Sequence, residues 1–206
     1  MAKRVAVVDY GAGNLDSVAR ALEECGARPV VTAEKGEVER ADAIVLPGVG
    51  AFARGMAGLR STGLEEALSE RVWANGVPFL GLCLGMQLLA AASDESPGVA
   101  GLGWFDAEVR RLEPNGELER VPHVGWNELR IDRDSRLLAQ IPSGTDFYFV
   151  HSYYVDCADQ HDVIATTPYC SGFPSVIGRG NVCGVQFHPE KSQRAGFRLL
   201  RNFLEL

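Results

Sequence analysis

Long hydrophobic runs are lacking from this sequence of 206 residues. The chain starts basic and then turns apolar, but the run Val5–Val8 ends at Asp9 and is too short for a signal peptide. No other run approaches the length of a membrane span. Positive charge is also scarce, because the net charge is -7. We therefore expect neither a nucleic acid nor a membrane among the partners.

Cysteine is sparse, and its spacing does not suggest a framework. The number of cysteines is odd, and no two of them form a CxxC motif; they are Cys25, Cys83, Cys157, Cys170 and Cys183. This pattern argues against a disulfide scaffold and against a zinc site, so we expect no metal. It favours a reducing compartment, and we expect a cytoplasmic protein.

A glycine loop of the phosphate-binding kind is incomplete. Gly11 and Gly13 follow the first apolar segment, but Asp16 occupies the place where GxGxxG needs its third glycine. Asn14 is expected to cap a helix over residues 15–25 instead. We expect no cofactor.

The pattern along the chain predicts one α/β domain over residues 1–206. Apolar segments at 3–9, 27–32 and 42–46 alternate with helical patterns, which is typical of a parallel sheet with right-handed crossovers. From residue 104 the texture changes to shorter strands of an antiparallel or mixed region. An amphipathic helix is predicted over the last segment, 192–206.

The sequence does contain a decapeptide, residues 78–87 (PFLGLCLGMQ), that is typical of a nucleophile on a sharp strand-to-helix turn. Cys83 stands between Gly81 and Gly85, where side chains would collide with the strand and the helix. A helix is expected over residues 84–92, and its N-terminus favours a thiolate. A buried structural cysteine in such a turn fits the decapeptide equally well.

A glycine-rich loop, residues 47–50 (PGVG), follows the strand predicted at 42–46. Ligands of doubly wound sheets bind beyond the carboxyl ends of the strands. Cys83 stands at another such end, so we expect the 47–50 loop and Cys83 to be neighbours. An ordinary turn between a strand and a helix is the alternative.

A base for the cysteine has to come from four histidines. Pro189 favours an extended conformation at His188, so Glu190 can reach its imidazole from two residues further on. A carboxylate on one ring nitrogen leaves the other free to take a thiol proton. His151 competes, but it has no carboxylate at matching spacing, and His161 stands in a polar loop as an exposed residue.

In combination, three motifs resemble the class I (triad) glutamine amidotransferases: PGVG at 47–50, GLCLGMQ at 81–87 and QFHPEKS at 186–192. Three further stretches narrow the resemblance to the glutaminase subunits of imidazole glycerol phosphate synthases; they are YGAGNLDSV at 10–18, PHVGWNEL at 122–129 and FYFVHSYY at 147–154. The resemblance extends over nearly the whole chain. It implies a flavodoxin-like α/β fold with a central, mostly parallel sheet flanked by helices, and with additional antiparallel strands in the C-terminal half.

The resemblance also implies roles for individual residues. Cys83 would be the nucleophile on glutamine, and His188 and Glu190 would complete the triad. The tetrahedral intermediate would be held by the amide of Leu84 and by an amide from Val49 or Gly50. The glutamine itself would be bound by four residues, namely Gln87, Glu95, Ser152 and Tyr153.

The ammonia released in this reaction would be used by a separate cyclase subunit with a (β/α)₈-barrel fold. Four residues are expected on the surface that contacts the cyclase: Asn14, Trp126, Asn127 and Tyr148. Three other functions remain open. The chain could serve another acceptor, as in pyridoxal phosphate synthesis; it could be a stand-alone γ-glutamyl hydrolase; or it could be a silent regulatory module. We expect the isolated chain to be nearly inactive.

Overall fold

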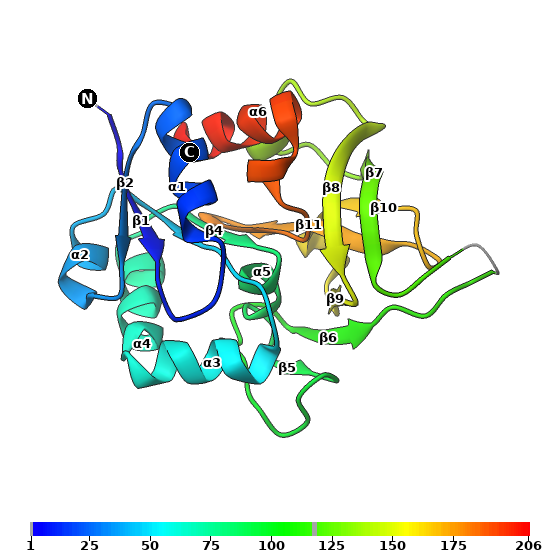
Figure 1. Ribbon diagram of the computed structural model, residues 1–206, viewed down its shortest axis with the longest axis horizontal. Helices are drawn as coiled ribbons and strands as arrows, with labels where there is room; N and C mark the ends of the chain where they lie inside the picture. The colour runs from blue at the N-terminus through cyan, green and yellow to red at the C-terminus, as the bar shows by residue number, and fades with distance from the viewer. Residues whose placement is uncertain (1, 117–118) are drawn as a thin grey trace.

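The computed structural model describes residues 2–116 and 119–206, and within them a nine-stranded mixed sheet forms the centre of the fold (Figure 1). The strand order is β2-β1-β3-β4-β12-β11-β10-β7-β8. These strands are β1 (Arg4–Val8), β2 (Arg28–Thr32), β3 (Ala43–Leu46), β4 (Phe79–Leu82), β7 (His123–Ile131), β8 (Thr145–His151), β10 (Val163–Thr167), β11 (Phe173–Arg179) and β12 (Val182–Val185).

The first five strands in this order are parallel to one another, and successive residues of each face opposite sides. In β1, Val5 and Val7 contact the apolar cluster that includes residues of α1 and α6, whereas Ala6 and Val8 contact the cluster of α3, α4 and α5. Figure 1 shows the same division, with α1 and α6 on one side of the sheet and α3 and α4 on the other. The parallel strands are therefore buried on both faces, as their apolar composition predicts.

The helices are short, and none of those in the described ranges is long and apolar enough to cross a membrane. They are α1 (Leu15–Glu24), α2 (Lys35–Glu39), α3 (Phe52–Ser61), α4 (Leu64–Ser69), α5 (Leu84–Gln87) and α6 (Gln193–Leu204), with a π-helical turn at Glu70–Ala74 and 3₁₀ turns at Arg136–Leu138, Gln160–Asp162 and Pro189–Lys191. The predicted helices over 15–25 and 192–206 are confirmed to within a few residues. Asn14 occupies the N-cap position of α1, although its side chain makes no capping hydrogen bond.

The second half of the sheet is antiparallel from β12 to β8. A three-stranded sheet lies beside it and consists of β5 (Ala92–Ser93), β6 (Ala107–Arg111) and β9 (Tyr153–Cys157). The prediction of a mostly parallel α/β sheet with added antiparallel strands is confirmed. β8 and β9 belong to different sheets, and the chain crosses from one sheet to the other at Ser152.

The helix predicted over residues 84–92 is wrong in its length, because α5 ends at Gln87. The carbonyls of Leu88, Leu89 and Ala90 are engaged by a distant segment instead of by the next helical turn. The amides of residues 102–105 donate to these three carbonyls at 2.9 to 3.1 Å. Tertiary hydrogen bonds thus replace the local ones that helical periodicity anticipates.

Candidate active site

Cys83 occupies a strained turn between β4 and α5. Its φ of 52° and ψ of -107° lie in a region that side-chain-bearing residues rarely adopt. The flanking glycines permit the turn: a Cβ on Gly81 would lie 2.6 Å from the Gly85 carbonyl oxygen, and a Cβ on Gly85 would lie 1.8 Å from that of Leu46. A side chain at Gly81 or at Gly85 would therefore collide with the neighbouring backbone, as predicted from the sequence. Strain of this kind is typical of functional positions.

The histidine and the carboxylate form a buried pair. His188 follows β12 in an extended conformation, and its Nδ1 lies 2.9 Å from Glu190 Oε1. The His188 amide donates to the carbonyl of Tyr148 at 2.9 Å, while its own carbonyl accepts from the Ser192 hydroxyl at 2.6 Å. These contacts fix the imidazole. Among the described residues, His188 Nε2 and Glu190 Oε2 are buried with no hydrogen-bond partner, so neither atom is committed to another group of the fold.

Three influences act on the protonation of His188. Burial lowers the pKa of the imidazole, but the Cys83 side chain and the Glu190 carboxylate outweigh burial and raise the pKa to about 9. The two side chains that face the imidazole thus favour its protonated form.

Gln186 is a fourth polar residue at the sulfur, and sequence reasoning missed it. Its side chain is fully buried, and its Nε2 lies 3.6 Å from Cys83 Sγ. The same side chain accepts a hydrogen bond from Gln87 Nε2 at 3.2 Å through its own Oε1. The sequence alone gives no separate signal for this contact, because Gln186 reaches the sulfur only through the pairing of β12 with β4.

A cavity of about 380 Å³ opens onto Cys83, a size that suits a small ligand. It brings together all seven residues predicted for the oxyanion and for glutamine, together with two others on β8. Its lining is Val49, Gly50, Cys83, Leu84, Gln87, Glu95, Val150, His151, Ser152 and Tyr153. Three larger cavities, of about 500, 600 and 650 Å³, are lined by none of these residues.

Two of the predicted glutamine ligands already make hydrogen bonds within the protein. Gln87 Nε2 donates to the carbonyl of Tyr153 at 2.9 Å. Glu95 Oε2 accepts from the Phe52 amide at 2.7 Å, at the start of α3. This second bond ties the loop of Glu95 to the helix that follows the 47–50 loop. The carboxylate therefore has a fixed position in the cavity wall.

Two buried histidines are hydrogen-bonded to each other at the cavity wall, which His151 lines. His151 Nδ1 lies 2.8 Å from the carbonyl oxygen of Tyr153, so Nδ1 carries the proton, and His151 Nε2 accepts from Nδ1 of His123 at 3.1 Å. Asn127 Nδ2 donates to the remaining nitrogen of His123 at 3.2 Å. Burial lowers the pKa of His151 to about 3 and that of His123 to about 4. Both rings are therefore neutral near pH 7, and no acidic side chain in the described part of the chain is hydrogen-bonded to His151.

The four predicted interface residues are placed as follows. Trp126 is 48% exposed on β7, and its ring lies edge-to-face with that of Tyr148, with centroids 5.9 Å apart. Asn127 follows on the same strand and is half-buried against His123. Asn14 is exposed at the start of α1. Val124, which was not predicted, is 58% exposed on β7 beside them.

Within residues 2–116 and 119–206 no group of three or more histidine, cysteine or acidic side chains is arranged to hold a metal ion. A strained cysteine at the carboxyl edge of an α/β sheet, with a buried histidine–glutamate pair, is the arrangement described here. The chain belongs to the glutamine amidotransferase class-I family, whose model matches residues 6–206.

Two relatives that are about half identical to this chain are subunits of imidazole glycerol phosphate synthases. The chain is 51% identical over 202 residues to the imidazole glycerol phosphate synthase subunit HisH of Moorella thermoacetica, covering 98% of this chain and 94% of the relative. It is 47% identical to the subunit of the same name from Rhodospirillum rubrum, covering 98% of both. A crystal structure of a glutamine amidotransferase, 22% identical, superposes with a TM-score of 0.76 over 97% of each chain. That last likeness concerns the fold.

Proposed function

We propose that this chain is the glutaminase subunit of an imidazole glycerol phosphate synthase, in L-histidine biosynthesis. As a single amidotransferase domain it hydrolyses L-glutamine to glutamate and ammonia, and it delivers the ammonia to a cyclase subunit. The observation that carries the proposal is the strained Cys83, which faces a 380 Å³ cavity with the His188–Glu190 pair fixed beside it. The relatives that are 39–51% identical over nearly their full length support the same assignment.

The reaction begins when His188 Nε2 takes the thiol proton and Cys83 Sγ attacks the side-chain amide carbon of glutamine. The resulting tetrahedral oxyanion is bound by the amide of Leu84 and by an amide of Val49 or Gly50. His188 then gives its proton to the departing nitrogen, which leaves as ammonia. Water hydrolyses the γ-glutamyl thioester on Cys83, releases glutamate and restores the thiol.

The remaining lining residues orient the substrate. Glu95 suits the α-ammonium group of glutamine, because a carboxylate pairs with a cation. Gln87, Ser152 and Tyr153 offer amide and backbone groups for the polar ends of the substrate. The wall that these residues form positions the amide carbon of glutamine over Cys83 Sγ.

The partner is the cyclase subunit, with a (β/α)₈-barrel fold, which joins the ammonia to a phosphorylated ribulosyl aminoimidazole nucleotide. The products are imidazole glycerol phosphate and aminoimidazole carboxamide ribonucleotide. We assign the contact surface to Trp126, Asn127 and Tyr148, with Asn14 at its edge, because a half-exposed tryptophan is a typical interface anchor. The heterodimer acts in the cytoplasm, without a nucleic acid, a membrane or a cofactor.

The test is glutamate release from glutamine by the purified chain. It is measured with the chain alone, with the cyclase subunit, and with the cyclase subunit and its nucleotide ligand; Cys83→Ala serves as the control. We expect strong stimulation by the loaded cyclase and none in the variant. Vigorous activity of the chain alone would favour a stand-alone γ-glutamyl hydrolase instead. Silence in every combination would favour a regulatory module or a different acceptor.

A further inference from the structure

The amide that the proposed mechanism assigns to the oxyanion is occupied. The Leu84 amide donates to the carbonyl oxygen of Gly48 at 3.3 Å, which is long for such a hydrogen bond. An oxyanion can bind this amide only after the Gly48 carbonyl has turned away. That carbonyl then needs another donor, because an unpaired backbone group in a buried place is costly.

One unused donor lies directly against Gly48. The hydroxyl of Tyr10 is buried and has no hydrogen-bond partner among the described residues, and the residue as a whole is 4% exposed. A Cβ on Gly48 would lie 2.2 Å from this hydroxyl oxygen and 2.9 Å from Cβ of Leu84. The phenol oxygen, the loop and the first residue of α5 therefore meet at one point.

Packing alone does not explain this hydroxyl. The ring of Tyr10 belongs to the apolar cluster of α3 and α5, where phenylalanine would fill the same space. Burying a hydroxyl without a partner costs free energy. The residue is also held in place, because a Cβ on Gly58 of α3 would lie 2.1 Å from the Tyr10 carbonyl oxygen. Tyr10 thus keeps an unpaired donor at a fixed position beside the 47–50 loop.

We propose that Tyr10 is a positioning residue for the oxyanion site. When the 47–50 loop turns, the Tyr10 hydroxyl donates a hydrogen bond to the Gly48 carbonyl and so releases the Leu84 amide for the substrate oxygen. This role rests on the proposed glutaminase function. Burial, and then negative charge at Cys83, raise the pKa of Tyr10 far above its usual range, so the hydroxyl keeps its proton throughout the reaction.

If Tyr10 has this role, three results are expected for the variant Tyr10→Phe. The kcat for glutamine should fall about ten- to a hundred-fold, while KM stays within about two-fold, because the oxyanion exists only along the reaction. Alkylation of Cys83 by iodoacetamide should keep its rate, since displacement at a saturated carbon develops no oxyanion. The thermal midpoint should rise, because the variant removes an unpaired buried hydroxyl. A merely structural tyrosine would lower the thermal midpoint.

The experiment uses the complex with the cyclase subunit and its nucleotide ligand, and compares wild type, Tyr10→Phe and Tyr154→Phe. Tyr154 lies on β9 outside the cavity lining, so its variant should keep the wild-type kcat. A lower kcat in Tyr10→Phe with unchanged alkylation and a raised midpoint supports the proposal. Full activity of this variant overturns it, and so does a parallel loss of alkylation or of stability. A wild-type complex that releases no glutamate would instead overturn the proposed function.

Discussion

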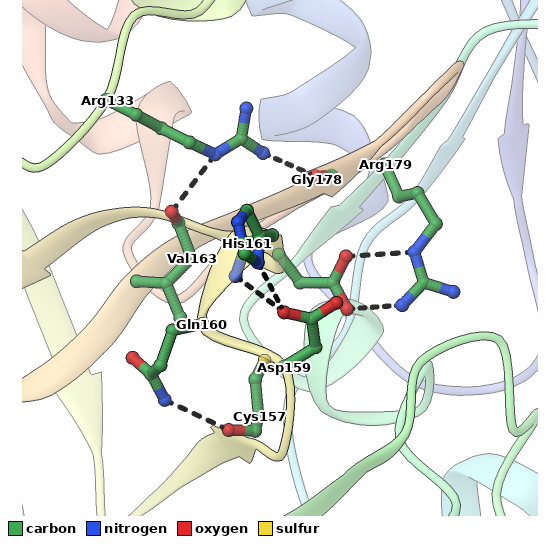
Figure 2. A network of polar contacts seen from close by, with 9 residues as sticks. Arg133, Cys157, Asp159, Gln160, His161, Val163, Gly178 and Arg179 are labelled. Carbon is green, nitrogen blue, oxygen red and sulfur yellow. Dashed lines mark hydrogen bonds and ion pairs between the residues drawn. The ribbon is translucent and has the colours of Figure 1, made fainter.

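Two pairs in this protein join a basic side chain to a buried carboxylate: Arg179 with Asp162, and His188 with Glu190. They differ in whether their other polar atoms have hydrogen-bond partners. Both oxygens of Asp162 accept from Arg179, and nearby Arg133 donates to the carbonyls of Val163 and Gly178 at 3.1 and 2.7 Å (Figure 2). None of the three charged side chains of this network, Arg133, Asp162 and Arg179, has a buried nitrogen or oxygen without a partner among the described residues.

The site around Cys83 has the opposite character. Six buried side-chain polar atoms in the described part of the chain lack a hydrogen-bond partner, and three of them belong to Tyr10, His188 and Glu190. The other three belong to Arg4, Arg71 and Thr167, outside the site. The contrast is therefore between the paired charges of the Arg179 network and the unpaired atoms gathered at Cys83. Variants should therefore separate the two regions. Those of the Arg179 network should change the stability of the fold, and those of the site around Cys83 should change the rate of glutamate release.

The largest expected effect is the loss of activity in Cys83→Ala. Without the thiolate no thioester forms, and glutamate release should fall at least about ten-thousand-fold. Among the described residues the sulfur makes only long hydrogen bonds, to the Val150 carbonyl at 4.0 Å and from Gln186 Nε2 at 3.6 Å, so the denaturant midpoint should stay close to that of wild type. Assay of the complex and urea unfolding of the chain check the two parts. A variant that loses activity by unfolding would break the contrast between the regions.

A smaller effect is expected for Glu190→Gln, which keeps the shape of the side chain and removes its charge. The kcat should fall by about a thousand-fold, because the imidazole loses the carboxylate that orients it and stabilises its charged form. The pKa of His188 is raised to about 9, in part by Glu190. Activity that needs the protonated ring to release ammonia therefore declines above about pH 9 in wild type.

In Glu190→Gln the pKa of His188 should be lower, so the alkaline decline should move to lower pH. The pH profile of kcat in the complex measures this shift. Glu66→Gln, at an exposed position of α4, is the matched control and should keep the wild-type profile. An unshifted decline in Glu190→Gln would mean that Glu190 does not set the protonation of His188.

The structural network should respond through stability. Asp162→Asn leaves Arg179 without its carboxylate, and the free energy of unfolding should fall by about 1–2 kcal/mol. The value stays below that of a fully buried pair because the Arg179 side chain is 48% exposed. Asp159→Asn is the matched control: this residue is exposed and accepts from His161, so its loss should cost less than about 0.5 kcal/mol. Both variants should keep the wild-type kcat; a fall in kcat would contradict the separation.

Much of the fold and of the candidate site could be predicted from patterns of residues that are close in sequence. The strands of the parallel half, the turn at Cys83 and the reach of Glu190 to His188 could be predicted, because each depends on residues that are close in sequence. That Cys83 lies close to the 47–50 loop could also be predicted, because both follow the carboxyl ends of parallel strands, where ligands of such sheets bind.

What could not be predicted depends on distant segments. The helix after Cys83 ends early because residues 102–105 take its carbonyls. The unpaired hydroxyl of Tyr10 is visible only once Gly48 is placed against it. The amide of Gln186 is likewise recognised at the sulfur only when β12 lies beside β4.

The smallest expected effect concerns the turn itself. Cys83 has a φ of 52°, and a strained backbone at a functional residue should cost free energy in the folded state. Cys83→Gly and Cys83→Ala both remove the thiol, but only glycine adopts this conformation readily. The glycine variant should be more stable by about 1 kcal/mol in urea unfolding. Ala19→Gly, within α1, is the control and should destabilise by a similar amount, because helical backbone has no such strain. If both changes to glycine lower stability alike, the turn holds Cys83 without strain, and the two regions differ only in their hydrogen bonds.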